Sequence, residues 1–146
     1  MQPRRLALTA ALVAANALTG AALAMPIRNL PPAETQGAVT YRTGGIGQSE
    51  AAAMRQAEPK YPLSLEFAER AGPKNWFLAN VEVTIKDQHG NTELRTFSDG
   101  PFLLARLPNG DYTVTATDNG RSETRHVTIA AGKSEHLMFM WPGTAS

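Results

Sequence analysis

Three histidines, His89, His126 and His136, are the side chains of this sequence best suited to metal binding or acid–base chemistry. His89 falls in a turn pattern, and we expect His126 and His136 to face solvent on neighbouring strands of a hairpin near the C-terminus. Two imidazoles across a hairpin could hold a metal ion, but metal sites bring three or four ligands and no third one is evident. The sequence therefore predicts no metal site and no cofactor, and the distance between the two histidines stays open.

Ser98 and Asp99 could form a hydrolase triad with one of these histidines. A nucleophilic serine of that kind lies in a Gly-x-Ser-x-Gly turn between a strand and a helix, and this pattern does not surround Ser98. Asp99 is better explained as a turn residue whose side chain bonds local backbone amides. We therefore expect no catalytic residue.

Acidic side chains recur at the predicted turns and could in principle bind calcium at one end of the fold. They lack the every-second-residue spacing of a calcium-binding loop, so we expect solvated turn residues instead. The residues concerned are Asp87, Asp99, Asp111 and Asp118.

Trp76 follows the polar stretch Gly72-Pro73-Lys74-Asn75 and is the candidate for an exposed aromatic platform of the kind that stacks against sugars. The other interpretation is that Trp76 seals an open edge of the core, which is favoured because aromatic side chains mostly serve packing. Both interpretations stay open.

Short strands with turn signals between them account for most of the chain. Asn119-Gly120 is the strongest hairpin signal, because both residues accept the left-handed dihedrals of a tight primed turn. Alternation from residue 77 to 85 also predicts one inward face for that strand. Seven strands at this spacing predict an antiparallel sandwich. They are expected near residues 61–67, 76–86, 92–97, 102–106, 111–117, 122–130 and 134–141.

Residues 48–58 form the one predicted helix, which Ser49 can cap and Pro59 stops. The stretch 25–45 is rich in proline and polar residues and is expected to be a flexible leader. The sequence thus predicts a single β-sandwich domain over 46–142, which includes the helix, followed by a tail at 143–146.

The first 24 residues have a basic start, an apolar middle and small residues ending at Ala24, the pattern of a secretory signal peptide. We expect cleavage near Ala24, a periplasmic or secreted protein, and no stable membrane insertion afterwards. Cleavage removes Arg4 and Arg5, so the formal charge of +1 becomes 1 − 2 = −1. A chain without an excess of positive charge is poorly suited to bind the phosphates of nucleic acid, which argues against nucleic acid as a partner. The chain has no cysteine, so its fold depends on its core alone.

One set of turn and strand motifs consists of Ser98-Asp99-Gly100-Pro101-Phe102, Leu107-Pro108-Asn109-Gly110-Asp111-Tyr112-Thr113-Val114 and Asn119-Gly120. With these motifs the chain resembles the carboxypeptidase regulatory-like domain over roughly residues 77–141, which implies an all-β, antiparallel, seven-stranded Greek-key sandwich of the prealbumin type. Such modules are appended to peptidases, receptors and surface proteins, so the resemblance implies little about activity. Upstream, the chain looks like a group of small exported bacterial proteins.

Tyr112 follows the Pro-Asn-Gly turn at the start of a predicted strand and is typical of a tyrosine corner, in which the hydroxyl bonds backbone upstream. The alternative is a tyrosine at the edge of the core without that bond. Gly100 and Gly110 are expected to be the bends on either side of this corner.

These observations favour a non-enzymatic exported module that binds another envelope or extracellular protein through strand edges, loops or the helix. The alternative is a carbohydrate-binding domain that uses Trp76 and its loop. A hydrolase is the third hypothesis, because the prealbumin-type fold has an enzymatic branch, the hydroxyisourate hydrolases. That branch ends in a Tyr-Arg-Gly-Ser type tail, whereas this chain ends Trp141-Pro142-Gly143-Thr144-Ala145-Ser146.

Overall fold

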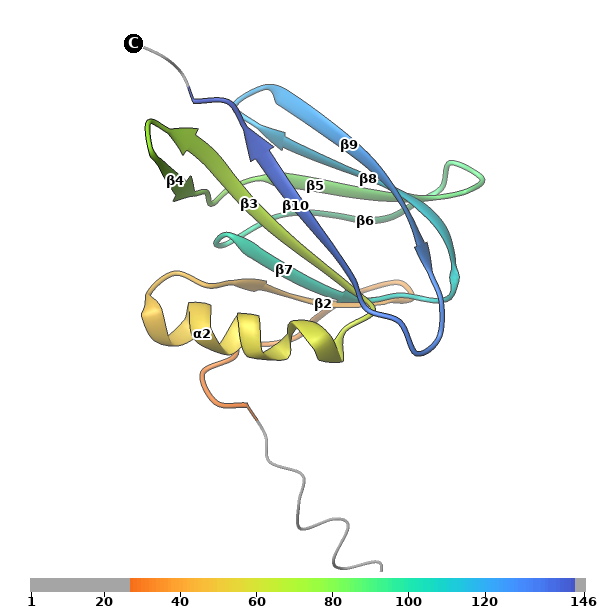
Figure 1. Cartoon of the computed structure of the whole chain (residues 1–146). Coiled ribbons are helices and arrows are strands. Elements are labelled where there is room, and N and C mark those ends of the chain that lie inside the picture. Colours follow the sequence, from red (N-terminus) through yellow and green to blue (C-terminus); the bar gives the residue numbers. More distant parts are fainter. Residues whose placement is uncertain (1–26, 144–146) are drawn as a thin grey trace, which may run out of the picture.

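The computed structural model describes residues 27–143 and consists of two β-sheets packed face to face, with one helix on the outer face of the larger sheet (Figure 1). The expected signal peptide and its cleavage site lie outside the described residues. So does the expected tail, apart from Gly143.

The larger sheet has six strands. Its order is β1 (Glu34–Gln36), β2 (Val39–Gly44), β7 (Phe102–Arg106), β3 (Leu63–Ala71) and β10 (Glu135–Trp141), and β4 (Lys74–Phe77) pairs with the second half of β3. The smaller sheet has four strands in the order β6 (Thr92–Phe97), β5 (Glu82–Asp87), β8 (Gly110–Asp118) and β9 (Arg121–Ile129). The predicted sandwich is confirmed, with ten strands among the described residues where seven were expected.

Alternating side chains from both sheets fill the space between them, as the period of two in the sequence predicts. The tight turn between β8 and β9 also follows its sequence, because Asn119 and Gly120 adopt φ values of 48° and 77°. The large side chains that are almost completely buried in this core are Leu63, Leu65, Phe67, Ile85, Leu94, Leu103, Phe139 and Trp141.

Strand β7 is buried on both faces. Leu103 belongs to the core between the sheets, whereas Phe102 and Leu104 point outward and pack against Met54 of helix α2 (Gln48–Ala57). The helix continues as the single turn η1 (Glu58–Lys60), in close agreement with the predicted range 48–58. The helix therefore covers the outer face of the larger sheet beside its central strand (Figure 1).

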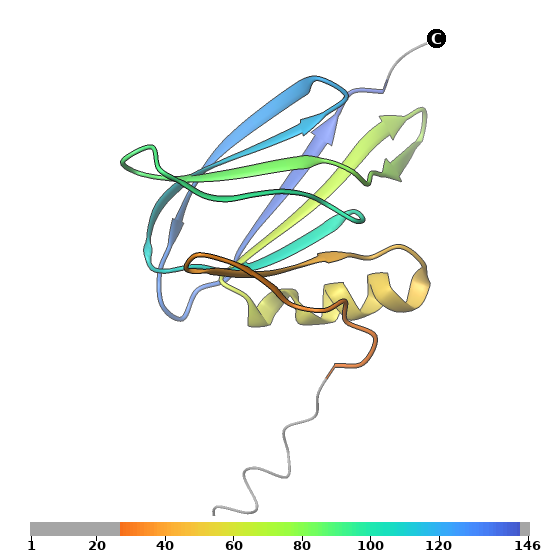
Figure 2. The ribbon, with the colours of Figure 1, turned by 180° about the vertical axis from the view of Figure 1, so that it is seen from behind.

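The expectation of a flexible leader over 25–45 is wrong for residues 34–44. These residues form β1 and β2, and β2 pairs along its length with β7. Val39 and Tyr41 point into the core and are 0% and 4% exposed. Without β2, the edge of β7 would expose unpaired backbone groups to solvent. Figure 2 shows this hairpin from behind, at one edge of the larger sheet.

Two further expectations about strand pairing are corrected. Strand β10 pairs in parallel with β3, in register from Glu135 opposite Leu63 to Trp141 opposite Glu69, so the sandwich is not purely antiparallel. Strands β9 and β10 do not form a hairpin, because the connection after Ile129 crosses from the smaller to the larger sheet. His126 and His136 consequently lie on different sheets.

The strand expected over residues 76–86 is two strands. Strand β4 ends at Phe77, Asn80 adopts a φ of 58°, and β5 then begins in the other sheet. Because of this crossing, Phe77 is 52% exposed and does not share the inward face of β5. Among the described residues, the structure contains no helix long and apolar enough to span a membrane.

Candidate functional site

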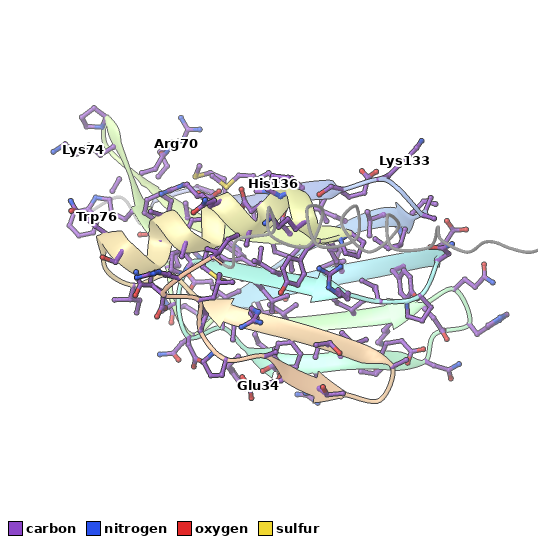
Figure 3. All side chains as sticks on the ribbon, turned by 90° about the horizontal axis from the view of Figure 1, so that it is seen from below. Glu34, Arg70, Lys74, Trp76, Lys133 and His136 are labelled. Atoms are coloured by element: carbon purple, nitrogen blue, oxygen red, sulfur yellow. The ribbon has the colours of Figure 1, made fainter. Side chains whose placement is uncertain are left out.

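Three side chains that can bind metal ions meet on the outer face of the larger sheet, beside the C-terminal end of the helix. Glu58 comes from η1, Glu66 from the middle of β3 and His136 from the start of β10. One donor atom from each lies within 4.8 Å of the other two. Figure 3 shows His136 beside α2. We call these three residues the Glu–Glu–His cluster.

The imidazole of His136 lies between the two carboxylates. Its Nδ1 is 3.4 Å from Oε2 of Glu58, and its Nε2 is 3.7 Å from Oε1 of Glu66. The same Nδ1 is hydrogen-bonded to Oγ of Ser64 at 2.8 Å. The second oxygen of Glu66, Oε2, lies 3.8 Å from Nη2 of Arg55.

Glu58 carries the least satisfied polar atom of the cluster. Its Oε2 is shielded from solvent and receives no hydrogen bond. Burial raises the pKa of Glu58 above its ordinary value, and the nearby charge of Glu66 raises it further, whereas His136 and Arg55 oppose the shift. The site therefore combines two carboxylates in a place where a cation would satisfy an unpaired oxygen.

The second feature is an exposed apolar surface around β4 and the start of the helix. Trp76, Phe77 and Ile46 are 63%, 52% and 66% exposed. A cavity of about 330 Å³ lies between Ile46 and Phe77 and reaches Phe102. The guanidinium of Arg55 lies 5.4 Å from the ring centre of Phe77. Because Trp76 is mostly exposed, it does not seal the core.

Tyr112 and Gly110 form the corner at the start of β8, whereas Gly100, the other predicted bend, precedes β7. The hydroxyl of Tyr112 donates a hydrogen bond of 2.7 Å to the carbonyl oxygen of Pro108, upstream as in a tyrosine corner. Gly110 has a φ of 156° and lies against the Tyr112 ring, and Gly100 packs directly on the backbone of Gly44. These residues shape the fold and bring no reactive group to a site.

Residues 73–141 match the family model of the carboxypeptidase regulatory-like domain. This confirms the resemblance for that part of the chain. Among solved structures, the chain is similar to a minor pilin of Streptococcus agalactiae, with 21% identity and a TM-score of 0.47. The similarity covers 57% of this chain and 44% of the pilin chain, so it spans less than half of that protein. No curated protein matches the chain.

The range that matches the family model supplies only part of each candidate site. His136, Trp76 and Phe77 lie within the matched range, whereas Glu58 and Glu66 precede it. The segment before residue 73 thus completes the Glu–Glu–His cluster. Ile46 and Arg55 likewise complete the apolar surface beside β4.

The other two histidines, His89 and His126, lie apart from the Glu–Glu–His cluster. Nδ1 of His126 lies 3.2 Å from Oγ1 of Thr113 on the smaller sheet. His89 lies in the turn after β5, where its backbone N–H donates to Oδ1 of Asp87. The expectation that His126 and His136 lie on neighbouring strands of one hairpin is therefore wrong.

Ser98 has a structural role. It is fully buried, and its Oγ accepts a hydrogen bond from the backbone N–H of Val81 at 3.1 Å. The backbone N–H of Asp99 donates to Oγ1 of Thr43. Of the other aspartates at turns, Asp87 caps its own turn and Asp118 pairs with Arg121 at 3.0 Å.

Sequence reasoning missed the Glu–Glu–His cluster because its members are distant in sequence. One signal was present: Glu66 and His136 both occupy the polar, outward positions of strands whose other face is apolar. To use that signal, one would have to know that β3 and β10 are neighbours, and nothing local in the sequence indicates this pairing.

Proposed function

We propose that this chain is a non-enzymatic accessory module, exported from the cell, that binds an extended segment of an envelope or extracellular protein along strand β4. The observation that carries this proposal is the exposed edge strand itself. All four residues of β4 are exposed, and β4 pairs with β3 along one of its two edges. An exposed strand edge offers unpaired backbone groups to an incoming strand.

The side chains around β4 support a partner segment that is both apolar and acidic. Phe77 and Ile46 border the cavity of about 330 Å³, which suits an apolar side chain. Arg70 and Lys74 are exposed on the same hairpin as Trp76, and Figure 3 shows these three residues at one end of the molecule. Positive charge beside an apolar cavity favours a segment in which apolar residues alternate with glutamate or aspartate.

Fluorescence anisotropy with labelled decapeptides tests this proposal. We expect a peptide of alternating valine and glutamate to bind, and a peptide of alternating valine and lysine to bind much more weakly. Lys74→Glu should reverse this preference, and Phe77→Ala should weaken binding of both peptides. The matched control is Phe97→Ala, since Phe97 is 58% exposed on strand β6 of the other sheet. Equal binding of both peptides, or equal loss in Phe97→Ala, would contradict the proposal.

Carbohydrate binding is the second candidate, and the exposed indole of Trp76 is the observation that favours it. The chain has two tryptophans, and Trp141 is only 1% exposed, so oligosaccharides would quench the emission of Trp76 alone. Quenching that disappears in Trp76→Phe would support this function. A panel of glycans that leaves the emission unchanged would remove it.

Export is supported by the sequence pattern of residues 1–24. The intact mass of the protein recovered from the producing bacterium tests it, because cleavage near Ala24 removes a defined mass. A full-length mass in the cytoplasmic fraction would contradict export.

A further inference from the structure

We propose that Glu58, Glu66 and His136 bind a divalent transition-metal ion and that zinc is the ion their donor set fits. Zinc accepts imidazole nitrogen and carboxylate oxygen as ligands, and three protein ligands with water as the fourth complete its tetrahedral coordination. All three donor atoms already lie within 4.8 Å of one another. Arg55 lies between this cluster and the apolar residues beside β4, but the three proposed ligands are not among those residues, so the inference does not depend on the proposed function.

The hydrogen bonds around His136 leave one ring nitrogen available for the ion. Nδ1 lies 2.8 Å from Oγ of Ser64, so the tautomer with its proton on Nδ1 donates to the serine. Nε2 then presents its lone pair toward Oε1 of Glu66, 3.7 Å away. Zinc bonds of about 2.0–2.2 Å place tetrahedral ligand atoms about 3.3–3.6 Å apart, so a small adjustment of the side chains brings these two donors to bonding distance.

Glu58 provides the second observation. Its Oε2 is shielded from solvent and receives no hydrogen bond; it lies 3.4 Å from Nδ1 of His136, the ring nitrogen that is hydrogen-bonded to Ser64. A buried acceptor without a donor is unfavourable, and a bound cation would satisfy it. Arg55 does not fill this role, because its guanidinium approaches Oε2 of Glu66 and leaves Oε1 of that residue for the ion.

The three ligands come from three different elements, so the ion would join them. Glu58 follows helix α2, Glu66 is in β3 and His136 is in β10. A zinc ion at this position would fix the C-terminal end of the helix to the larger sheet. Binding to the folded chain alone should therefore stabilise it against unfolding.

Calorimetric titration with zinc chloride, after dialysis against a chelator, tests the proposal on residues 25–146. We expect one zinc ion per chain, a higher melting temperature with zinc, and no response to magnesium. Cobalt in place of zinc should give the visible absorption of a tetrahedral site.

Variants locate the ion. His136→Ala and Glu66→Gln should each lose at least tenfold in zinc affinity, which is about 1.4 kcal/mol. His126→Ala is the matched control, because it removes a histidine on the other sheet, and it should bind zinc as the wild type does. Because the His136 side chain is 44% exposed, its removal should leave the fold intact, and circular dichroism checks this. No zinc binding by the wild type, or equal affinity in His136→Ala, would overturn the proposal.

Discussion

The hydroxyl of Tyr112 donates a hydrogen bond of 2.7 Å to the backbone carbonyl of Pro108, four residues upstream. The bond closes the turn that brings the chain from β7 into β8. Tyr112 is only 7% exposed, so the carbonyl and the hydroxyl satisfy each other where water has little access. One side chain thus fixes the angle at which the chain enters the smaller sheet.

Tyr112→Phe should therefore lower the free energy of unfolding by about 1 kcal/mol, the usual net contribution of one hydrogen bond. Urea denaturation measures this loss as a lower midpoint. Tyr41→Phe is the matched control, because Tyr41 is similarly buried but its hydroxyl lies 3.5 Å from Oγ1 of Thr96, a much weaker contact. Equal midpoints for Tyr112→Phe and the wild type would contradict this role.

Sequence alone predicted the features that depend on neighbouring residues. Asn119-Gly120 specifies its own turn through the dihedrals that both residues tolerate, and the hydrogen bond of Tyr112 spans only four residues. The helix over 48–57 likewise follows from its alanines and from the proline that ends it. These interactions join residues that are close in the sequence, so a short sequence motif is enough to predict them.

Features that depend on residues far apart in the sequence could not be predicted from the sequence alone. Val39 and Tyr41 are the buried hydrophobic residues of β2, but this short alternation among polar residues does not reveal that β7 lies opposite. The parallel pairing that brings His136 next to Ser64 joins residues 72 apart. The Glu–Glu–His cluster depends on that pairing, so neither its existence nor its members could be read from spacing.

Gly100→Ala should destabilise the protein by about 1–3 kcal/mol, the usual range for overpacking. A Cβ at this position would lie 2.5 Å from the carbonyl oxygen of Gly44, and backbone in a paired strand cannot move away easily. Thermal unfolding measures this loss as a lower melting temperature. An unchanged melting temperature in Gly100→Ala would mean that the close approach to Gly44 is not important for stability.

Asp87→Ala should weaken the protein at neutral pH but much less in acid. Hydrogen bonds from the backbone of Asn91, its side chain and the backbone of His89 hold the pKa of Asp87 below its ordinary value of 3.8. The ionised carboxylate therefore stabilises the fold above pH 3.8, and this contribution is lost as the pH falls through the lower pKa of the folded state. Urea midpoints of both proteins, measured from pH 7 downward, should converge. A difference that stays constant into acid would contradict this account.

Gln36 joins the edges of the two sheets with its side chain, and Gln36→Ala should open this side of the sandwich. Its Nε2 donates to the carbonyl oxygen of Arg95 at 2.9 Å, and its Oε1 accepts from the N–H of the same residue at 3.1 Å. The amide thus pairs with β6 as the backbone of a neighbouring strand would. Hydrogen exchange measured by NMR should show a faster-exchanging Arg95 amide in Gln36→Ala, with Ile85 of the adjacent strand β5 unchanged.

Gln36→Glu separates the two bonds. The carboxylate keeps an acceptor for the N–H of Arg95 but has no donor for its carbonyl oxygen. We therefore expect the Arg95 amide to stay protected in Gln36→Glu, while the melting temperature still falls because one hydrogen bond is lost. If the Arg95 amide exchanges equally fast in Gln36→Ala and in the wild type, the side chain of Gln36 does not close the sandwich and the edge of β6 is protected in another way.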